Sequence, residues 1–178
     1  WILTDRSLVR ISPDQSIVNY PIPDSLISAN WNPTSIAADM SRNIWIGTTG
    51  GLLLYSMQQN MFKIIVGEST QGLLSNHEVQ CLFIDTENIL WVGTQNGLNR
   101  VDPVDYSFYQ YFPGGTSVFQ PANIVVDISA SGNDQIILAT GAGIEILDKT
   151  TLQFRNIYLA GTNRVNSVSA DQYGIIWG

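Results

Sequence analysis

The chain has 178 residues, a mass of 19.6 kDa and 44% hydrophobic residues, enough for about one domain with a buried core. Eight Lys and Arg residues against fifteen Asp and Glu residues give a net charge of −7 without any basic cluster, so nucleic acid and anionic membrane surfaces are excluded as partners. A lone cysteine, Cys81, excludes an internal disulfide, and no apolar run reaches the roughly 18 residues of a membrane helix, so we expect any targeting or anchoring signal outside this chain.

A short motif recurs along the chain and sets its organisation. Residues 43–48 (NIWIGT) return at 89–94 (ILWVGT) and, in degenerate form, at 136–140 (IILAT). Periods of this kind indicate a repeat architecture. The repeat anchors are Trp1, Trp45, Trp91, Ile137 and Trp177, at spacings of 44, 46, 46 and 40 residues.

Each period contains four predicted strands in a fixed order. An alternating strand with small residues comes first, and it ends at a position six residues before the anchor, occupied by Asp39, Asp85, Ser131 and Asp171. Turn-forming residues three before the anchor, Arg42, Asn88, Asp134 and Gly174, predict a hairpin into the anchor strand. A second turn is expected at Gly51, Gly97 and Gly143, and outer strands begin at Phe62, Phe108 and Phe154.

Four short antiparallel strands per period, small inside and polar outside, are typical of a β-propeller blade. The sequence therefore predicts an all-β fold, a single β-propeller segment over residues 1–178 with about four blades of four-stranded antiparallel sheet. The first and last blades are expected to be incomplete. A β-solenoid, the rival architecture, usually has shorter coils and does not need an exposed fourth strand.

The repeated motif points to one family of propeller repeats, beyond the propeller fold itself. The pattern Asp-x-x-x-x-Ile/Leu-Trp-Ile/Val-Gly-Thr-x-x-Gly-Leu, at residues 39–52 and 85–98, resembles the two-component regulator propeller repeat. The third period departs from it at Ile137 and Ala139, and the first has Leu3 where glycine is expected. The resemblance implies the periplasmic sensor region of a carbohydrate-responsive hybrid histidine kinase, and a larger, seven-bladed ring of which this chain is part. The alternative is that the two ends complete one composite blade and close the ring.

Catalytic and metal chemistry find little support in the sequence. His77 is the only histidine, which excludes multi-histidine metal sets, and we expect no metal or cofactor. Asp39, Asp85 and Asp171 recur at one repeat position, so we expect them to accept hydrogen bonds from hairpin amides rather than to act as paired catalytic acids. No catalytic residue is predicted.

One end of the blades gathers a polar set suited to binding. In a propeller, the connections between blades share a face with the turns between second and third strands. A tryptophan outside the repeat pattern, Trp31, lies in such a connection, where it could stack against a sugar ring or pack under its own loop. The predicted ligand-binding residues are Arg6, Trp31, Asn76, His77, Gln95, Asn96 and Arg164, with Arg6 and Arg164 serving an anionic sugar if a ring brings them together.

These residues favour a non-enzymatic, ligand-sensing role. By the resemblance, the segment is periplasmic, binds an oligosaccharide or other small ligand, and joins the remaining blades and downstream domains of a sensor histidine kinase, with a homodimer possible. No nucleic acid or direct membrane contact is expected. The alternatives are a scaffold for protein contact or receptor dimerisation and, less favoured, a propeller lyase or glycosidase.

Overall fold

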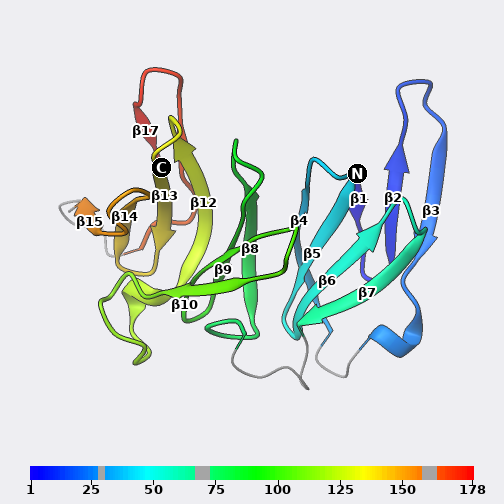
Figure 1. Cartoon of the computed structure of the whole chain (residues 1–178), viewed down its shortest axis with the longest axis horizontal. Coiled ribbons are helices and arrows are strands. Elements are labelled where there is room, and N and C mark those ends of the chain that lie inside the picture. Colours follow the sequence, from blue (N-terminus) through cyan, green and yellow to red (C-terminus); the bar gives the residue numbers. More distant parts are fainter. Residues whose placement is uncertain (28–30, 67–72, 158–163) are drawn as a thin grey trace.

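The described part of the chain forms five antiparallel sheets that stand face to face in an arc (Figure 1). The computed structural model describes residues 1–27, 31–66, 73–157 and 164–178, and within them three sheets have four strands, the first has three and the last has two. The predicted all-β propeller is confirmed. No helix of the described residues has the length and apolarity needed to cross a bilayer.

The strands follow one another from the inner to the outer edge of each complete sheet. The first sheet contains β1 (Ile2–Leu3), β2 (Ser7–Ile11) and β3 (Ile17–Pro21), and the second contains β4 (Pro33–Ala38), β5 (Asn43–Thr48), β6 (Gly51–Ser56) and β7 (Met61–Val66). The third sheet contains β8 (Val79–Ile84), β9 (Leu90–Thr94), β10 (Gly97–Val101) and β11 (Phe108–Tyr111), and the fourth contains β12 (Val125–Ser131), β13 (Gln135–Thr140), β14 (Gly143–Asp148) and β15 (Phe154–Ile157). The fifth sheet contains β16 (Ser169–Ala170) and β17 (Ile176–Trp177). Two short 3-10 helices, η1 (Asp24–Leu26) and η2 (Pro121–Asn123), lie in connections between sheets.

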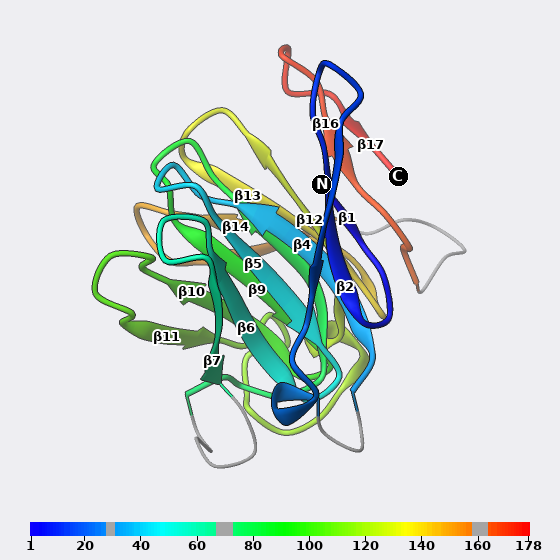
Figure 2. The same cartoon turned by 90° about the vertical axis from the view of Figure 1, so that its right-hand side faces the viewer.

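The inner strands of neighbouring sheets pack against one another along one side of the arc. β4 packs against β8 and β8 against β12, and Figure 2 shows β4 and β12 on one side of the stack, with the outer strands β7 and β11 on the other. β1 and β17 belong to different sheets at opposite ends of the arc in Figure 1. No composite blade therefore forms between them among the described strands.

The hydrophobic core is divided into slabs, one between each pair of neighbouring sheets. Trp45 and Val92 are fully buried between the second and third sheets, and Trp91 and Leu138 are buried between the third and fourth. The predicted anchor Trp177 differs, because its side chain on the last sheet is 62% exposed. Each blade is thus stabilised mainly by the apolar area that it shares with its neighbours.

The glycine of the anchor strand is required by the neighbouring blade. A Cβ atom on Gly93 would lie 2.4 Å from Sγ of Cys81 and 2.7 Å from Cγ1 of Val125, which begins the next inner strand. Cys81 is buried in this contact, and desolvation strongly raises the pKa of its thiol. In the fourth sheet Ala139 takes the equivalent position and is fully buried.

An aspartate braces the first hairpin of each regular blade. Asp39 accepts hydrogen bonds from the backbone amide of Asn43 at 2.8 Å and from the indole Nε1 of Trp45 at 3.0 Å. Asp85 does the same with the amide of Ile89 at 3.0 Å and the indole of Trp91 at 2.9 Å. The expected hairpin role is therefore confirmed, and the anchor tryptophan is a second donor to the same carboxylate.

The fourth sheet lacks both partners of this brace, since Ser131 replaces the aspartate and Ile137 the tryptophan. The hairpin turn of the fourth sheet also differs from the others in its backbone. Arg42, Asn88 and Gly174 have positive φ angles of 64°, 62° and 78°, whereas in the fourth sheet the positive φ belongs to Gly132 instead of the expected Asp134.

An ion pair joins the third and fourth blades. Nζ of Lys149, in the turn after β14, donates to Oδ2 of Asp85 at 2.9 Å and also bonds Glu87. Burial opposes ionisation of Asp85, but the hydrogen bonds from Trp91 and Lys149 outweigh it and lower its pKa below the usual value.

The Gly93 contact predicts a strong effect of a single methyl group. We expect Gly93→Ala to lower the free energy of unfolding by about 1–3 kcal/mol, because the new Cβ must displace Cys81 and backbone atoms of Val125. The repeat-matched change Ala139→Gly should cost only about 0.5–1 kcal/mol, chiefly through backbone entropy. Urea denaturation of both variants checks this, and equal losses would contradict the close-packing explanation.

The brace predicts a specific acid sensitivity. Because the folded-state pKa of Asp85 lies below its usual 3.8, ionised Asp85 stabilises the fold above that pH, and the stabilisation disappears as pH falls through the folded-state pKa. Asp85→Asn should lower stability at about pH 7 and flatten the loss of stability below about pH 4. Unfolding free energies measured across this range, with exposed Asp134→Asn as control, test this prediction; an unchanged slope in Asp85→Asn would refute it.

Candidate functional site

The turn between the second and third strands has the same construction in each complete blade. In the third sheet, Oγ1 of Thr94 donates to the carbonyl of Gly97 at 2.8 Å and accepts from the amide of Asn96 at 3.2 Å, and Gly97 has a φ of 127°. The turn therefore presents Gln95 and Asn96 at its tip. The amide of Gln95 donates to the carbonyl of Glu78 at 3.0 Å, which fixes this tip beside the connection that enters β8.

These two segments border an open pocket of about 430 Å³ at this end of the third blade, here called the loop-face pocket. It brings together three of the predicted residues, Asn76, His77 and Asn96. The remaining walls come from the end of the outer strand β11 and from the loop that follows it. The full lining is Leu74, Ser75, Asn76, His77, Asn96, Gln110, Phe112 and Ser117.

A buried amide in β10 holds Ser75, one of the residues that line the loop-face pocket. The Asn99 side chain is fully buried; its Oδ1 accepts from the amide of Ser75 at 2.8 Å and its Nδ2 donates to the hydroxyl of Ser75 at 3.0 Å. The Ser75 hydroxyl lies 3.0 Å from that of Thr94. The network ties the connection into β8 to the strands of its own blade.

A second buried amide, Asn123 in η2, fixes the opposite wall. Its Oδ1 accepts from the amide of Gly114 at 2.9 Å, and its Nδ2 donates to the carbonyls of Thr116 and Val118 and to Oδ1 of Asn96 at 3.1 Å. Asn96 in turn donates to the carbonyl of Ser117 at 3.0 Å. The loop between β11 and η2 is therefore held to the turn that carries Asn96.

The lining of the loop-face pocket combines hydrogen-bonding side chains with one aromatic ring. None of its lining residues is Asp, Glu, Lys or Arg; its polar groups are amides, hydroxyls and one imidazole, and the ring of Phe112 is among its apolar groups. Asn76 uses its Oδ1 on the amide of Glu78 at 2.8 Å, which leaves its side-chain nitrogen to donate. Amides with an aromatic wall match the hydroxyls and apolar faces of a sugar ring.

The carboxylates near the turns serve the fold instead. Hydrogen bonds from Ser107 lower the pKa of Asp105, and hydrogen bonds from Thr151 and Thr150 lower that of Asp148. Within the described residues, no group of three or more His, Cys, Asp or Glu side chains could hold a metal ion.

Two predicted residues lie in the first blades, away from the loop-face pocket. Trp31 donates its indole N–H to the carbonyl of Asp5 at 2.7 Å, and its partly buried ring packs against the cluster around Leu8 and Ile22. This is the packed arrangement of the two considered from sequence. Arg6 forms an exposed ion pair with Asp24 at 2.7 Å.

The arc does not unite the two predicted arginines. Arg6 lies in the turn between β1 and β2, and Arg164 lies in the connection that leads to β16; these sheets stand at opposite ends of the arc (Figure 1). Gln95 lies at the tip beside Asn96 but does not line the loop-face pocket.

Sequence reasoning missed the two residues that organise the pocket, Asn99 and Asn123. A signal existed for Asn99, because the equivalent position in the second blade holds Leu53, and an amide buried in a strand needs a hydrogen-bond partner. Asn123 lies in a connection that the repeat does not cover, so periodicity carries no information about it.

Comparison with known proteins places the repeat. Residues 72–96 match the family model described as two component regulator propeller, and this segment contains Asn76, His77, Gln95 and Asn96. A curated relative, histidine kinase P4 of Formosa agariphila, is 29% identical, with 75% of this chain and 10% of that protein covered. The chain thus spans about one tenth of the length of this relative.

Solved structures share the fold over nearly the whole chain. The extracellular domain of a hybrid two-component system from B. thetaiotaomicron has a TM-score of 0.74 at 19% identity, with 98% of this chain and 25% of that chain covered. Virginiamycin B lyase of Staphylococcus aureus has a TM-score of 0.71 at 15% identity, covering 97% of this chain and 56% of that chain. The motif-based prediction is therefore confirmed where the family model matches, at residues 72–96, and the described sheets have the β-propeller fold.

Proposed function

We propose that this chain is a ligand-binding segment in the periplasmic sensor region of a hybrid two-component histidine kinase, and that the loop-face pocket binds a neutral sugar unit of an oligosaccharide. The convergence of Asn76, His77 and Asn96 around 430 Å³ carries the proposal. The family match at residues 72–96 and the similarity to a histidine kinase support the sensor context.

The support for binding rather than catalysis lies in how the polar groups are held. None of the described residues that line the loop-face pocket is a carboxylate, so they do not supply the pair of acids that glycoside hydrolysis needs. Its walls are fixed in advance by the amides of Asn99 and Asn123. Such preorganisation favours binding, because little loop ordering remains to oppose it.

Signalling requires that the ligand favour one arrangement of the sensor over another, with a coupling of about 1–3 kcal/mol. The loop-face pocket suits this requirement because its residues lie on the connection between the second and third blades and on the loop that leads to the fourth. A bound sugar would bridge these connections and stiffen the relation between blades. The downstream domains of the parent sensor would transmit that change.

Removal of the imidazole should weaken sugar binding without unfolding the protein. Titration calorimetry of the 178-residue chain against neutral and acidic oligosaccharides should find a neutral ligand whose affinity falls about tenfold or more in His77→Ala, the loss of roughly one hydrogen bond and one ring contact. Asn133→Ala, in the hairpin between β12 and β13 at the other end of the blades, is the control and should bind normally.

Thermal melting provides the second readout of this experiment. A ligand at about 100 times its Kd should stabilise the chain by about 2.7 kcal/mol. A cooperative melt that no sugar shifts would refute the binding role of this segment, and an equal loss of affinity in both variants would refute the assignment to the loop-face pocket.

Loss of preorganisation should weaken binding from a distance. Asn123→Ala removes a fully buried amide that holds Gly114, Thr116 and Val118, so we expect a loss of about 1–3 kcal/mol in stability and faster hydrogen exchange at the Gly114 amide. Sugar affinity should fall although the side chain does not line the pocket. Unchanged exchange at Gly114 would contradict the bracing role.

A further inference from the structure

The turn between the third and fourth strands places one repeat position over each interface between blades. Asn60, Tyr106 and Leu152 occupy this position in successive sheets, 46 residues apart, with φ angles of 51°, 58° and 58°. The backbone at this position therefore has the same left-handed φ in all three turns, and the amides of Tyr106 and Leu152 make the same bond, to the carbonyls of Asp102 and Asp148. The side chain at this position differs from turn to turn.

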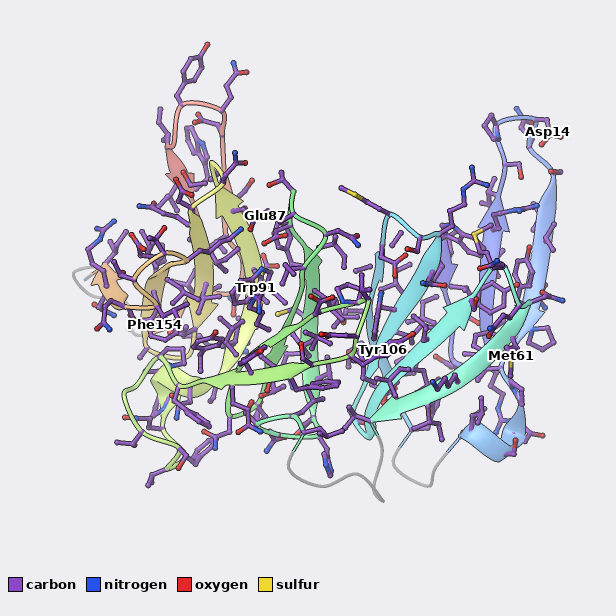
Figure 3. The ribbon with its side chains drawn as sticks, in the orientation of Figure 1. Asp14, Met61, Glu87, Trp91, Tyr106 and Phe154 are labelled. Atoms are coloured by element: carbon purple, nitrogen blue, oxygen red, sulfur yellow. The ribbon has the colours of Figure 1, made fainter. Side chains whose placement is uncertain are left out.

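Between the second and third sheets, this side chain is an aromatic ring. The Tyr106 ring lies 6.0 Å from that of Trp45, centroid to centroid, and Nζ of Lys63 lies 5.3 Å from the tyrosine centroid. Figure 3 shows Tyr106 on the side of the third sheet that faces the second. A ring and a cation thus cover the anchor tryptophan of the second sheet.

Between the third and fourth sheets, the ring is absent. Leu152 replaces the tyrosine, and a cleft of about 330 Å³, here called the interblade cleft, lies beside Trp91. Figure 3 shows Trp91 below Glu87 on the side that faces the fourth sheet. The cleft is lined by Glu87, Trp91, Arg100, Tyr109, Tyr111, Lys149 and Leu152.

The interblade cleft offers aromatic rings and one guanidinium that is not in an ion pair within the described residues. The Tyr111 ring lies 6.2 Å from that of Trp91, and the Arg100 guanidinium lies 5.5 Å from the centroid of Tyr109, which is 50% exposed. Lys149 is already bound to Asp85 and Glu87. Arg100, in contrast, forms no ion pair with any carboxylate of the described chain within 4.0 Å.

We propose that the interblade cleft is a second ligand site, independent of the loop-face pocket, for a ring that carries a carboxylate. The ring takes the place that Tyr106 fills at the neighbouring interface and packs on the tyrosines beside Trp91. The carboxylate pairs with Arg100, whose planar guanidinium can bind it with two hydrogen bonds. Uronic acids and aromatic carboxylates share this chemistry, and the experiment separates them.

The repeat itself supplies the blocking variant. Leu152→Tyr places the ring of Tyr106 at the equivalent position, on a backbone with the same φ, and should fill the cleft without loss of stability. The probes are galacturonate, glucuronate and 4-hydroxybenzoate, with galactose as the neutral comparison. The readout is the NMR indole N–H signal of Trp91, with that of Trp45 at the filled interface as internal reference.

We expect at least one carboxylate probe, but not galactose, to shift the Trp91 signal and leave that of Trp45 in place. Leu152→Tyr and Arg100→Gln should each weaken this binding by about tenfold or more. Val104→Tyr, which adds the same ring at a residue that is 81% exposed, should bind normally.

Shifts with uronates alone identify an acidic sugar, and shifts with 4-hydroxybenzoate alone identify an aromatic acid. The proposal is overturned if no carboxylate probe shifts Trp91, or if Leu152→Tyr binds as well as the unmodified chain. Neither result depends on His77, so failure here leaves the loop-face proposal standing, and failure there leaves this one standing.

Discussion

The structure depends on an aspartate whose carboxylate accepts hydrogen bonds both from the backbone of a hairpin and from a tryptophan of the core. Asp39 and Asp85 each accept from a hairpin amide and from the indole of the anchor tryptophan, so the turn cannot form correctly without also orienting the largest side chain of the slab. A hydrogen bond to an ionised acceptor contributes about 1.5–3 kcal/mol. Local turn formation and packing between blades are therefore coupled in every regular repeat.

This coupling explains why the fold could be predicted from the sequence. Each residue of the repeated motif has one structural role. The aspartate bonds the hairpin, the tryptophan fills the core between neighbouring sheets, and the glycine leaves room for the next inner strand, as at Gly93. Where Ser131 and Ile137 replace the pair, the strand persists because its neighbours still bury it; Ile137 is fully buried. The period, rather than any single residue, carried the information.

The candidate sites were less predictable, for a physical reason. Asn76, His77 and Asn96 meet because the repeat places connections and turns on one face, which topology alone supplies. The partners of Asn123, in contrast, are backbone groups of an irregular loop, and no periodic pattern encodes them. Trp31 shows the same limit, since its indole bonds a carbonyl in a preceding turn that only the folded chain brings near.

The buried thiol of Cys81 lies at the contact between the third and fourth blades, so its reactivity depends on whether these blades separate. Its sulfur lies 3.7 Å from the carbonyl of Val125 in the neighbouring inner strand, and desolvation keeps it protonated and inert. A thiol reagent can modify it only while these two strands stand apart. The rate of modification thus measures how often the two blades separate, and a ligand that bridges them would slow that rate without touching the cysteine.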